Sequence, residues 1–545
     1  MEIDEKLSDE VLVLDVWCDE NGFAAVPFNL AGQKDAVVCV DWHDGEDENL
    51  QELDEKSSLL GCVHRYVDPK SVHRIEVSSP DWSRVCICGI RNSVGILSKE
   101  GQYPPQSFAG VMSRCRFRIK SPLPALKGTA VLDVNETRDA DQPFEWKPEM
   151  QEGSMAAAMT LFRTIEEMPE DLFSRNAASS FDSAFRWCRI RCAVPAGLFK
   201  GQGEAKSFSA CFGGCEFGAP DALPDGLFQD CAKAEDFSRV FALSNIAAVP
   251  EGIFNGCGSA LDYGAAFART RIASLPQARL FAHSPKAKRF TGCFFECQNL
   301  HSAPTGLFAG TSGQNFYLCF YGCTNLESIG GIFSSCAEAE TFAACFTGCS
   351  SLVTIPVDLF WGCRKVKSFS RCFEGCESIV RIGHSFLQDK PEAEDFSWMF
   401  KGCKRLAKIA ERLFEDCTSA ETFAGVFEDC RSLEILPVEL FGNCGNVLSF
   451  HRAFAKCSSL HTVDVNLLSW SPKLRDVCQC FDGCASLNNA VVRIDSDAVE
   501  NAFEFFPSRE SSGLSVAVPQ DTQTEERFQA ECRKSKGWTV ETFSL

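Results

Sequence analysis

Cysteine is the residue type in this chain with the most chemistry to offer. The 545 residues include 31 cysteines but only 8 histidines. Thiolates close together can hold a metal ion, two thiols can form a disulfide, and a buried thiol can serve as a small apolar side chain. Six pairs of cysteines are spaced four residues apart: Cys211/Cys215, Cys293/Cys297, Cys319/Cys323, Cys345/Cys349, Cys372/Cys376 and Cys480/Cys484.

Substitutions at equivalent positions favour the core interpretation of these pairs. A metal-ligand or disulfide position would not accept Val or Met while its partner stayed Cys. We therefore expect the thiols to fill an interior, with no metal and no cofactor, and we keep disulfides and metal ligation as alternatives. The first position also holds Val240, Ala266, Met399, Val426 and Ala453, and the second also holds Ser244 and Thr270.

Other residues with catalytic or ligand chemistry are few and scattered. No P-loop, G-x-G-x-x-G, H-E-x-x-H or G-x-S-x-G motif is present. The histidines fall at non-equivalent positions, so we predict no catalytic residue; a chance Cys–His pair is the alternative. One acidic run has the composition of either a calcium loop or a solvated hairpin. It comprises Asp41, Asp44, Glu46, Asp47 and Glu48.

The element that positions the cysteines is a repeat of the form F-x-x-C-F-x-x-C. Its aromatic or apolar anchors recur every 26 to 29 residues, a period typical of solenoid proteins. One unit cannot bury its apolar face alone, so stacking of units must form the core. The twelve anchors are Phe181, Phe208, Phe237, Tyr263, Phe290, Phe316, Phe342, Phe369, Phe396, Phe423, Phe450 and Val477.

The residue pattern of each repeat unit predicts two short helical turns and two short strands. Phe342, Phe346 and Cys349 have the i, i+4, i+7 spacing of one helical face. A residue of the N-cap type precedes eleven of the twelve anchors, Arg289 being the exception. A short strand such as 351–356, a proline-led second turn such as 356–363 and an extended return segment complete the unit.

The flanking regions give the domain organisation. Residues 1–100 contain apolar runs separated by turn signals, which predicts a small all-β sandwich domain. Residues 101–154 are expected to be a linker and N-terminal cap, and 155–488 the leucine-rich-repeat-like solenoid. Residues 489–545 are expected to form a C-terminal β-α-β cap, with a capping box at Thr522-x-x-Glu525 and a helix to about Lys534.

Charge and hydropathy limit the partners. The net charge is 53 − 74 = −21, which argues against nucleic acid and anionic membranes. No apolar stretch is long enough to span a bilayer, and the acidic start MEIDEKLSDE has no signal-peptide pattern, so we expect no membrane insertion and leave localisation open.

The best binding candidate is an outward-facing column two residues before each anchor. Mixed charges in this column would suit an extended partner, although an ordinary solvated sheet face is the alternative. The charged members are Lys206, Glu235, Lys288, Glu340, Lys367, Glu394, Glu421 and Arg475.

The repeat CSSLVTIPVDLFWGCRKVKSFSRCFEGC (349–376) resembles BspA-like leucine-rich repeats in a longer Phe/Cys-rich variant. AVVCVDWHDGE (36–46) with His64-Arg65-Tyr66 resembles the V-D-W-G-D-G … H-x-Y signature of PKD-like sandwich domains, with His43 in place of the usual Gly. These resemblances imply a bacterial surface or secreted adhesion protein that binds a protein or cell-surface ligand and has no active site. A component of a phage tail or similar particle and an enzyme are the alternatives; the oligomeric state is open.

Overall fold

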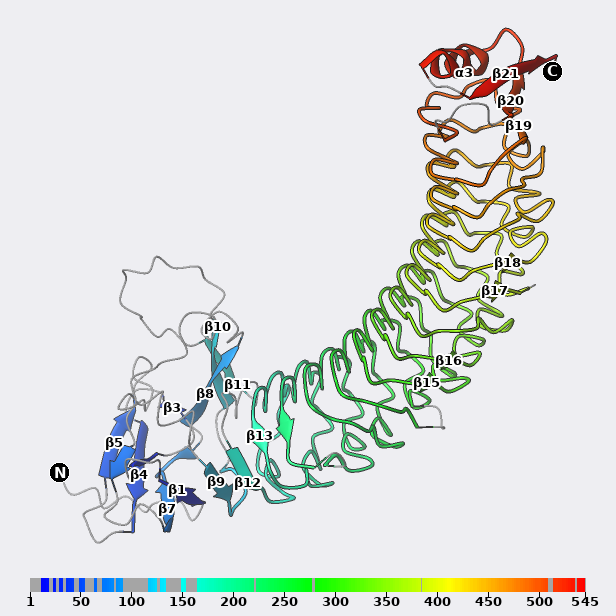
Figure 1. Cartoon of the computed structure of the whole chain (residues 1–545). Coiled ribbons are helices and arrows are strands. Elements are labelled where there is room, and N and C mark those ends of the chain that lie inside the picture. Colours follow the sequence, from blue (N-terminus) through cyan, green and yellow to red (C-terminus); the bar gives the residue numbers. More distant parts are fainter. Residues whose placement is uncertain are drawn as a thin grey trace. The chain divides into compact units, whose positions relative to one another are not determined.

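The computed structural model describes residues 11–18, 23–25, 29–32, 36–43, 49–53, 63–65, 71–82, 85–91, 116–124, 128–133, 149–152, 164–219, 222–276, 280–383, 385–507, 513–534 and 537–544. The chain divides into two compact units, 1–270 and 271–545. Each unit contains stacked coils of a β-solenoid, so the predicted repeat solenoid is confirmed (Figure 1). Very little of the described chain is helical, and none of its helices is long and apolar enough to cross a bilayer.

The first unit begins with strands that the apolar runs predicted. These are β1 (Leu12–Trp17), β4 (Ala36–Asp41), β7 (Val72–Ser78) and β8 (Val85–Arg91). Further strands lie between and after them: β2 (Phe23–Ala25), β3 (Asn29–Gly32), β5 (Asn49–Leu53), β6 (Val63–Arg65), β9 (Arg116–Ile119), β10 (Gly128–Asp133), β11 (Glu149–Glu152), β12 (Thr164–Glu167), β13 (Arg189–Ile190) and β14 (Glu216–Phe217).

Two main sheets organise these strands. One has eight strands in the order β14-β13-β12-β9-β1-β7-β4-β5, and the other has four in the order β11-β10-β8-β3. The larger sheet changes from antiparallel pairing in β5 to β9 to parallel pairing from β9 through β12 to β14. The N-terminal strands therefore run directly into the first coils by backbone pairing, a link that the sequence did not predict.

The predicted short helix in each coil is not formed, and a run of tight turns takes its place. We call the eight residues that start at an anchor the turn run, for example 342–349. In this run the N–H groups of Cys345, Thr347 and Cys349 donate to carbonyls three residues back, at 3.0 to 3.3 Å. The N–H groups at the first, third, fifth and seventh positions instead donate to the next coil. An α-helix leaves only its first four N–H groups without an intrahelical partner. The fifth and seventh N–H groups of a helical run would therefore bond four residues back and not to the next coil.

The cap residues predicted before each anchor complete this pattern. The N–H of the second run residue takes part neither in the bonds to the next coil nor in the bonds to carbonyls three residues back. It donates instead to the side chain of the cap residue. Thr341 Oγ1 accepts from the N–H of Ala343 at 3.1 Å, and Asp395 Oδ1 accepts from that of Ser397 at 2.9 Å. The Ser, Thr, Asp and Asn preference therefore reflects capping of a turn rather than of a helix.

Left-handed backbone at two positions of each run makes the turns possible. The third residue has a positive φ, as in Ala344 (52°) and Arg371 (56°), and so does the seventh, as in Gly348 (76°) and Lys456 (62°). This conformation carries a steric penalty in residues with a Cβ atom. Glycine fills the seventh position in several coils, which relieves the penalty there.

Stacked phenylalanine rings form the core of the coils. Phe342 stacks on Phe316 with ring centroids 5.3 Å apart, and Phe346 stacks on Phe320 at 5.5 Å. A third stack includes Phe360, whose ring meets Phe342 at 4.5 Å and joins the stacks to each other. All five rings are fully buried. Truncating one such ring to alanine costs about 3–5 kcal/mol in a packed core.

The second unit adds short paired strands and a terminal cover. Its strands and helix are β15 (Ser302–Ala303), β16 (Ser328–Ile329), β17 (Arg381–Ile382), β18 (Lys408–Ile409), β19 (Val491–Arg493), β20 (Leu514–Pro519), α3 (Gln523–Lys534) and β21 (Trp538–Phe543). Thr522 caps α3 as predicted, since its Oγ1 accepts from the N–H of Glu525 at 3.2 Å. The side chain of Glu525 accepts from the N–H of Asp521 at 2.7 Å rather than from that of Thr522, so half of the predicted capping box is formed. Phe528 of α3 packs on Phe505 at 5.2 Å, so α3 covers the last apolar coil of this unit (Figure 1).

Candidate functional site

The charged members of the predicted binding column are all exposed. We call its eight charged members the charged row. Each is exposed, whereas the small residues next to it, such as Ala339 and Val366, are fully buried. The members are Lys206 and Glu235 in the first unit and Lys288, Glu340, Lys367, Glu394, Glu421 and Arg475 in the second.

A backbone ladder holds the charged row in register. In the second unit the N–H of Lys367 donates to the carbonyl of Glu340 at 2.8 Å, and that of Glu394 donates to Lys367 at 2.9 Å. Gln314 lies between Lys288 and Glu340, and Leu448 lies between Glu421 and Arg475. The six charges of this unit therefore follow one line, about 4.8 Å per coil. In the first unit the N–H of Glu235 donates to the carbonyl of Lys206 at 2.8 Å.

Ion pairs between coils flank the charged row. Lys233 pairs with Glu204 at 2.6 Å, and Lys365 pairs with Glu338 at 2.7 Å. The hydrogen bond to Glu338 raises the pKa of Lys365. These pairs are exposed, so each contributes little to stability. They give the surface beside the row a mixed charge of fixed pattern.

The paired cysteines lie in the core of the coils. Cys319, Cys323, Cys345 and Cys349 are free thiols and are fully buried. Burial raises the pKa of Cys319 to about 11, so its thiol keeps its proton near neutral pH. In the described residues, no group of three or more His, Cys, Asp and Glu side chains is arranged to hold a metal ion.

Only part of the predicted acidic run can be located. His43 lies 3.3 Å from a carboxylate oxygen of Asp41 and 3.5 Å from one of Glu76, and its φ is 52°. The other members of the run, Asp44, Glu46, Asp47 and Glu48, lie outside the described residues.

A second surface, which the sequence did not single out, surrounds Trp361. This indole is 75% exposed and Val357 is 61% exposed, so both present apolar surface to solvent in the second turn of their coil. Large exposed aromatic side chains are typical of protein-binding surfaces. The equivalent positions in the two neighbouring coils hold Ser334 and Gln388. This change from polar residues to a tryptophan is the sequence signal that could have identified the surface.

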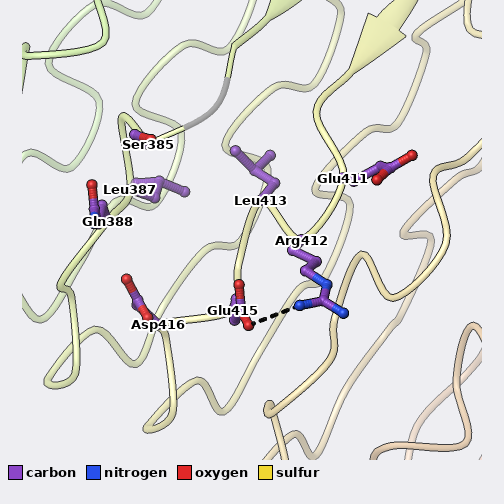
Figure 2. A pocket seen from close by; sticks show the side chains of 8 residues that line it. All are labelled: Ser385, Leu387, Gln388, Glu411, Arg412, Leu413, Glu415 and Asp416. Carbon is purple, nitrogen blue, oxygen red and sulfur yellow. Dashed lines mark hydrogen bonds and ion pairs between the residues drawn. The ribbon is translucent and has the colours of Figure 1, made fainter.

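Two adjoining hollows lie beside Trp361, and Ser385 and Gln388 line both. We call them together the Trp361 surface. One hollow, of about 420 Å³, is lined by Val357, Asp358, Trp361, Ser385, Gln388 and Asp389. The other, of about 240 Å³, is lined by Ser385, Leu387, Gln388, Glu411, Arg412, Leu413, Glu415 and Asp416 (Figure 2).

Carboxylates outnumber cations around these hollows. Five acidic side chains line them, against the single cation Arg412. Arg412 is itself paired with Glu415 at 3.5 Å and with Glu439 at 2.6 Å, as the dashed line in Figure 2 shows for Glu415. Within the described part of the chain, neither Asp358 nor Glu411 forms an ion pair.

A buried lysine shapes the segment between the two hollows. Lys390 occupies a position that is Cys363 and Cys417 in the neighbouring coils, and its Nζ donates to the backbone carbonyl of Gln388 at 2.6 Å. Burial lowers the pKa of Lys390. The coil thus departs from the repeat where the hollows form, and Lys390 fixes the backbone that lines them.

No protein-family model matches the chain, and no curated protein matches its sequence.

Proposed function

We propose that the chain is a non-catalytic recognition or adhesion protein that binds a protein or cell-surface partner through the charged row. One observation supports this above all: the row is exposed in every contributing coil and is held by a continuous backbone ladder within each unit. A partner that crosses the coils would meet charged side chains at a regular spacing. Repeat proteins commonly bind extended partners in this way.

The state of the thiols supports the non-catalytic part of the proposal. A cysteine nucleophile needs a thiolate and access to substrate. The thiols of Cys231 and Cys444 have neither, because both are buried in the core and burial raises the pKa of each to about 12.

The resemblance to BspA-like repeats and PKD-like domains stays part of this proposal. The left-handed φ of His43 is the conformation that a glycine would adopt, and glycine is the usual residue of the PKD-like signature at this position. This supports the resemblance without extending it to a particular ligand.

Site-specific photo-crosslinking tests the proposal. A photoreactive amino acid replaces Gln314, a half-buried residue of the same column that lies between Lys288 and Glu340. The control replaces Glu327, which is exposed outside this column. We expect a protein partner to crosslink from position 314 and not from 327. Charge reversal by Glu340→Lys should then weaken binding of that partner.

Two outcomes would count against the proposal. Equal crosslinking from both positions would mean that the row is not the binding surface. Crosslinks solely between copies of the chain, together with a stable trimer or larger assembly in light scattering, would favour a structural component of a larger particle.

A further inference from the structure

We propose that the Trp361 surface binds an arginine-bearing segment of a partner protein. The inference rests on the proposed function, because it assumes a protein partner, but it assigns a different surface and a specific chemistry. The occupant is inferred from three features of the surface: its charge, its exposed indole, and the arginine contacts that the chain itself makes nearby.

Charge complementarity selects a cationic occupant. The hollows carry five carboxylates. Asp389 is paired with Arg364 and Glu415 with Arg412. Among the described residues Asp358, Glu411 and Asp416 form no ion pair. The chain as a whole has a net charge of −21. A cationic side chain would therefore be attracted to this region and would find carboxylates to pair with.

The exposed indole favours arginine over lysine. A planar guanidinium can stack on the face of a tryptophan while its N–H groups bind a carboxylate, whereas an ammonium is a compact, strongly hydrated charge. Trp361 and Asp358 line the same hollow, so one guanidinium could contact both. Val357 adds apolar surface for the methylene part of the side chain.

The second unit itself contains both contacts that the proposal requires, an arginine stacked on a tryptophan and an arginine paired with a carboxylate. The guanidinium of Arg371 lies over the ring of Trp398, 4.4 Å from its centroid. At the edge of the larger hollow, Arg364 makes two hydrogen bonds with the carboxylate of Asp389, each 2.8 Å long. An arginine from a partner would repeat these two contacts at Trp361 and Asp358.

The shape of the surface depends on the departure from the repeat at Lys390. Its bond to the carbonyl of Gln388 holds the backbone between the hollows. In the preceding coil the equivalent residue, Cys363, donates instead to the carbonyl of Phe333 at 3.2 Å. The surface is therefore a local feature of this coil and its neighbours, unlike the charged row, which extends along many coils.

Titration of the full chain with acetylated tetra-arginine amide at near-physiological salt tests the inference. Tetra-lysine and tetra-glutamate amides are the comparison peptides. We expect binding in the order arginine, lysine, glutamate. Trp361→Ala should weaken arginine-peptide binding at least fivefold, and Asp358→Asn should weaken it severalfold, with unchanged circular dichroism.

Two matched controls separate this surface from general attraction. Trp470→Ala removes another indole that is 42% exposed, and Glu340→Gln removes one negative charge from the charged row. Trp470→Ala should leave binding of the arginine peptide within twofold of the unmodified chain, and so should Glu526→Gln, which removes one exposed negative charge in α3, outside both surfaces. Glu340→Gln reports instead on whether the peptide binds the charged row.

Several results would overturn the inference. They are the absence of arginine-peptide binding, equal affinity for the arginine and lysine peptides with no effect of Trp361→Ala, and equal effects of Trp361→Ala and Trp470→Ala. A loss with Glu340→Gln alone would move binding to the charged row, which would overturn the inference while supporting the proposed function. The crosslinking experiment at position 314 tests the proposed function independently of the Trp361 surface.

Discussion

The thiol of Cys349 donates a hydrogen bond to the backbone carbonyl of Phe320 in the preceding coil, with an Sγ–O distance of 3.2 Å. The same bond recurs at Cys323, Cys376, Cys430, Cys457 and Cys484, at 3.1 to 3.2 Å. Where the eighth run residue is not cysteine it is Ser244 or Thr270, whose hydroxyls donate to Phe carbonyls of their own coil. The eighth position therefore requires a hydrogen-bond donor, whereas the fourth position accepts valine, alanine and methionine.

The same substitution at these two positions should have different effects. Cys345→Val, at the fourth position, should change the free energy of unfolding by less than about 1 kcal/mol, because valine occurs there naturally. Cys349→Val should lower it by about 1–3 kcal/mol, because the donor is lost and a larger group enters a filled position. Urea unfolding followed by circular dichroism measures both. Cys349→Ser should recover part of the loss, and equal effects of the two valine variants would refute the donor requirement.

Removal of a cap side chain should destabilise its coil. Asp395→Ala leaves the N–H of Ser397 without the bond it makes at 2.9 Å. We expect the free energy of unfolding to fall by about 1 kcal/mol, as for loss of a helix N-cap. Asp395→Asn is the matched control, since asparagine fills this role at position 315, and it should retain most of the stability in the same urea titration. A loss as large as that of the alanine variant would show that charge, not capping, matters here.

Glycine at a strained run position should stabilise the fold. Lys456 is exposed and has a φ of 62° at the seventh position, where other coils have glycine. Lys456→Gly should raise the urea midpoint, with a gain of about 1 kcal/mol from the removal of left-handed strain. Lys456→Ala keeps the strain and is the control.

The reciprocal change tests the same cause. Gly375 has a φ of 73°, and an added Cβ would lie 3.7 Å from its nearest neighbours, an ordinary contact. Gly375→Ala should therefore lose stability through its backbone conformation alone. A neutral Gly375→Ala would argue against strain as the cause.

Alkaline pH should unfold the coils. Burial raises the pKa of Cys319 to about 11 and that of Cys363 to about 12, whereas a thiol in an unfolded chain ionises near 8.5–9. Between these values the folded chain holds more protons than the unfolded chain, so stability is complete below about pH 9 and falls as the pH rises. Each such thiol contributes a slope of about 1.4 kcal/mol per pH unit.

Urea midpoints at pH 7.5, 9 and 10 in the presence of a reductant measure this slope. Cys319→Val removes one titrating thiol from a position where valine is tolerated, so its midpoint should fall less between pH 9 and 10. A pH-independent midpoint for the unmodified chain would contradict the prediction.

Chain periodicity was sufficient to predict the solenoid and its core. Phe342, Phe346 and Cys349 were correctly expected to share one buried face, and the cap residues were correctly identified as side chains that accept a backbone N–H. The prediction of a short helix was wrong because the i, i+4, i+7 spacing fits a turn run equally well. The left-handed backbone of residues such as Ala344 distinguishes a turn run from a helix. An alanine in the sequence does not indicate that conformation. Glycine at the seventh position, as in Gly348, was the available clue.

The two candidate surfaces differ in how far the sequence could reveal them. The charged row follows from its fixed offset to the anchors, and its exposure agrees with that offset. The Trp361 surface arises where one coil departs from the repeat, at Lys390, so an average over coils hides it. Only comparison of Trp361 and Lys390 with their equivalents in neighbouring coils would have drawn attention to this place.

The hydrogen bonds of the turn runs have a consequence for how such a chain can change in length. Phe342 donates its N–H to Ser368 in the following coil, and Glu340 donates to Gln314 in the preceding one. Because each coil offers its neighbours the same donors and acceptors, excision or duplication of one whole period restores every bond at the new junction. The fold can thus grow or shrink in whole-coil steps.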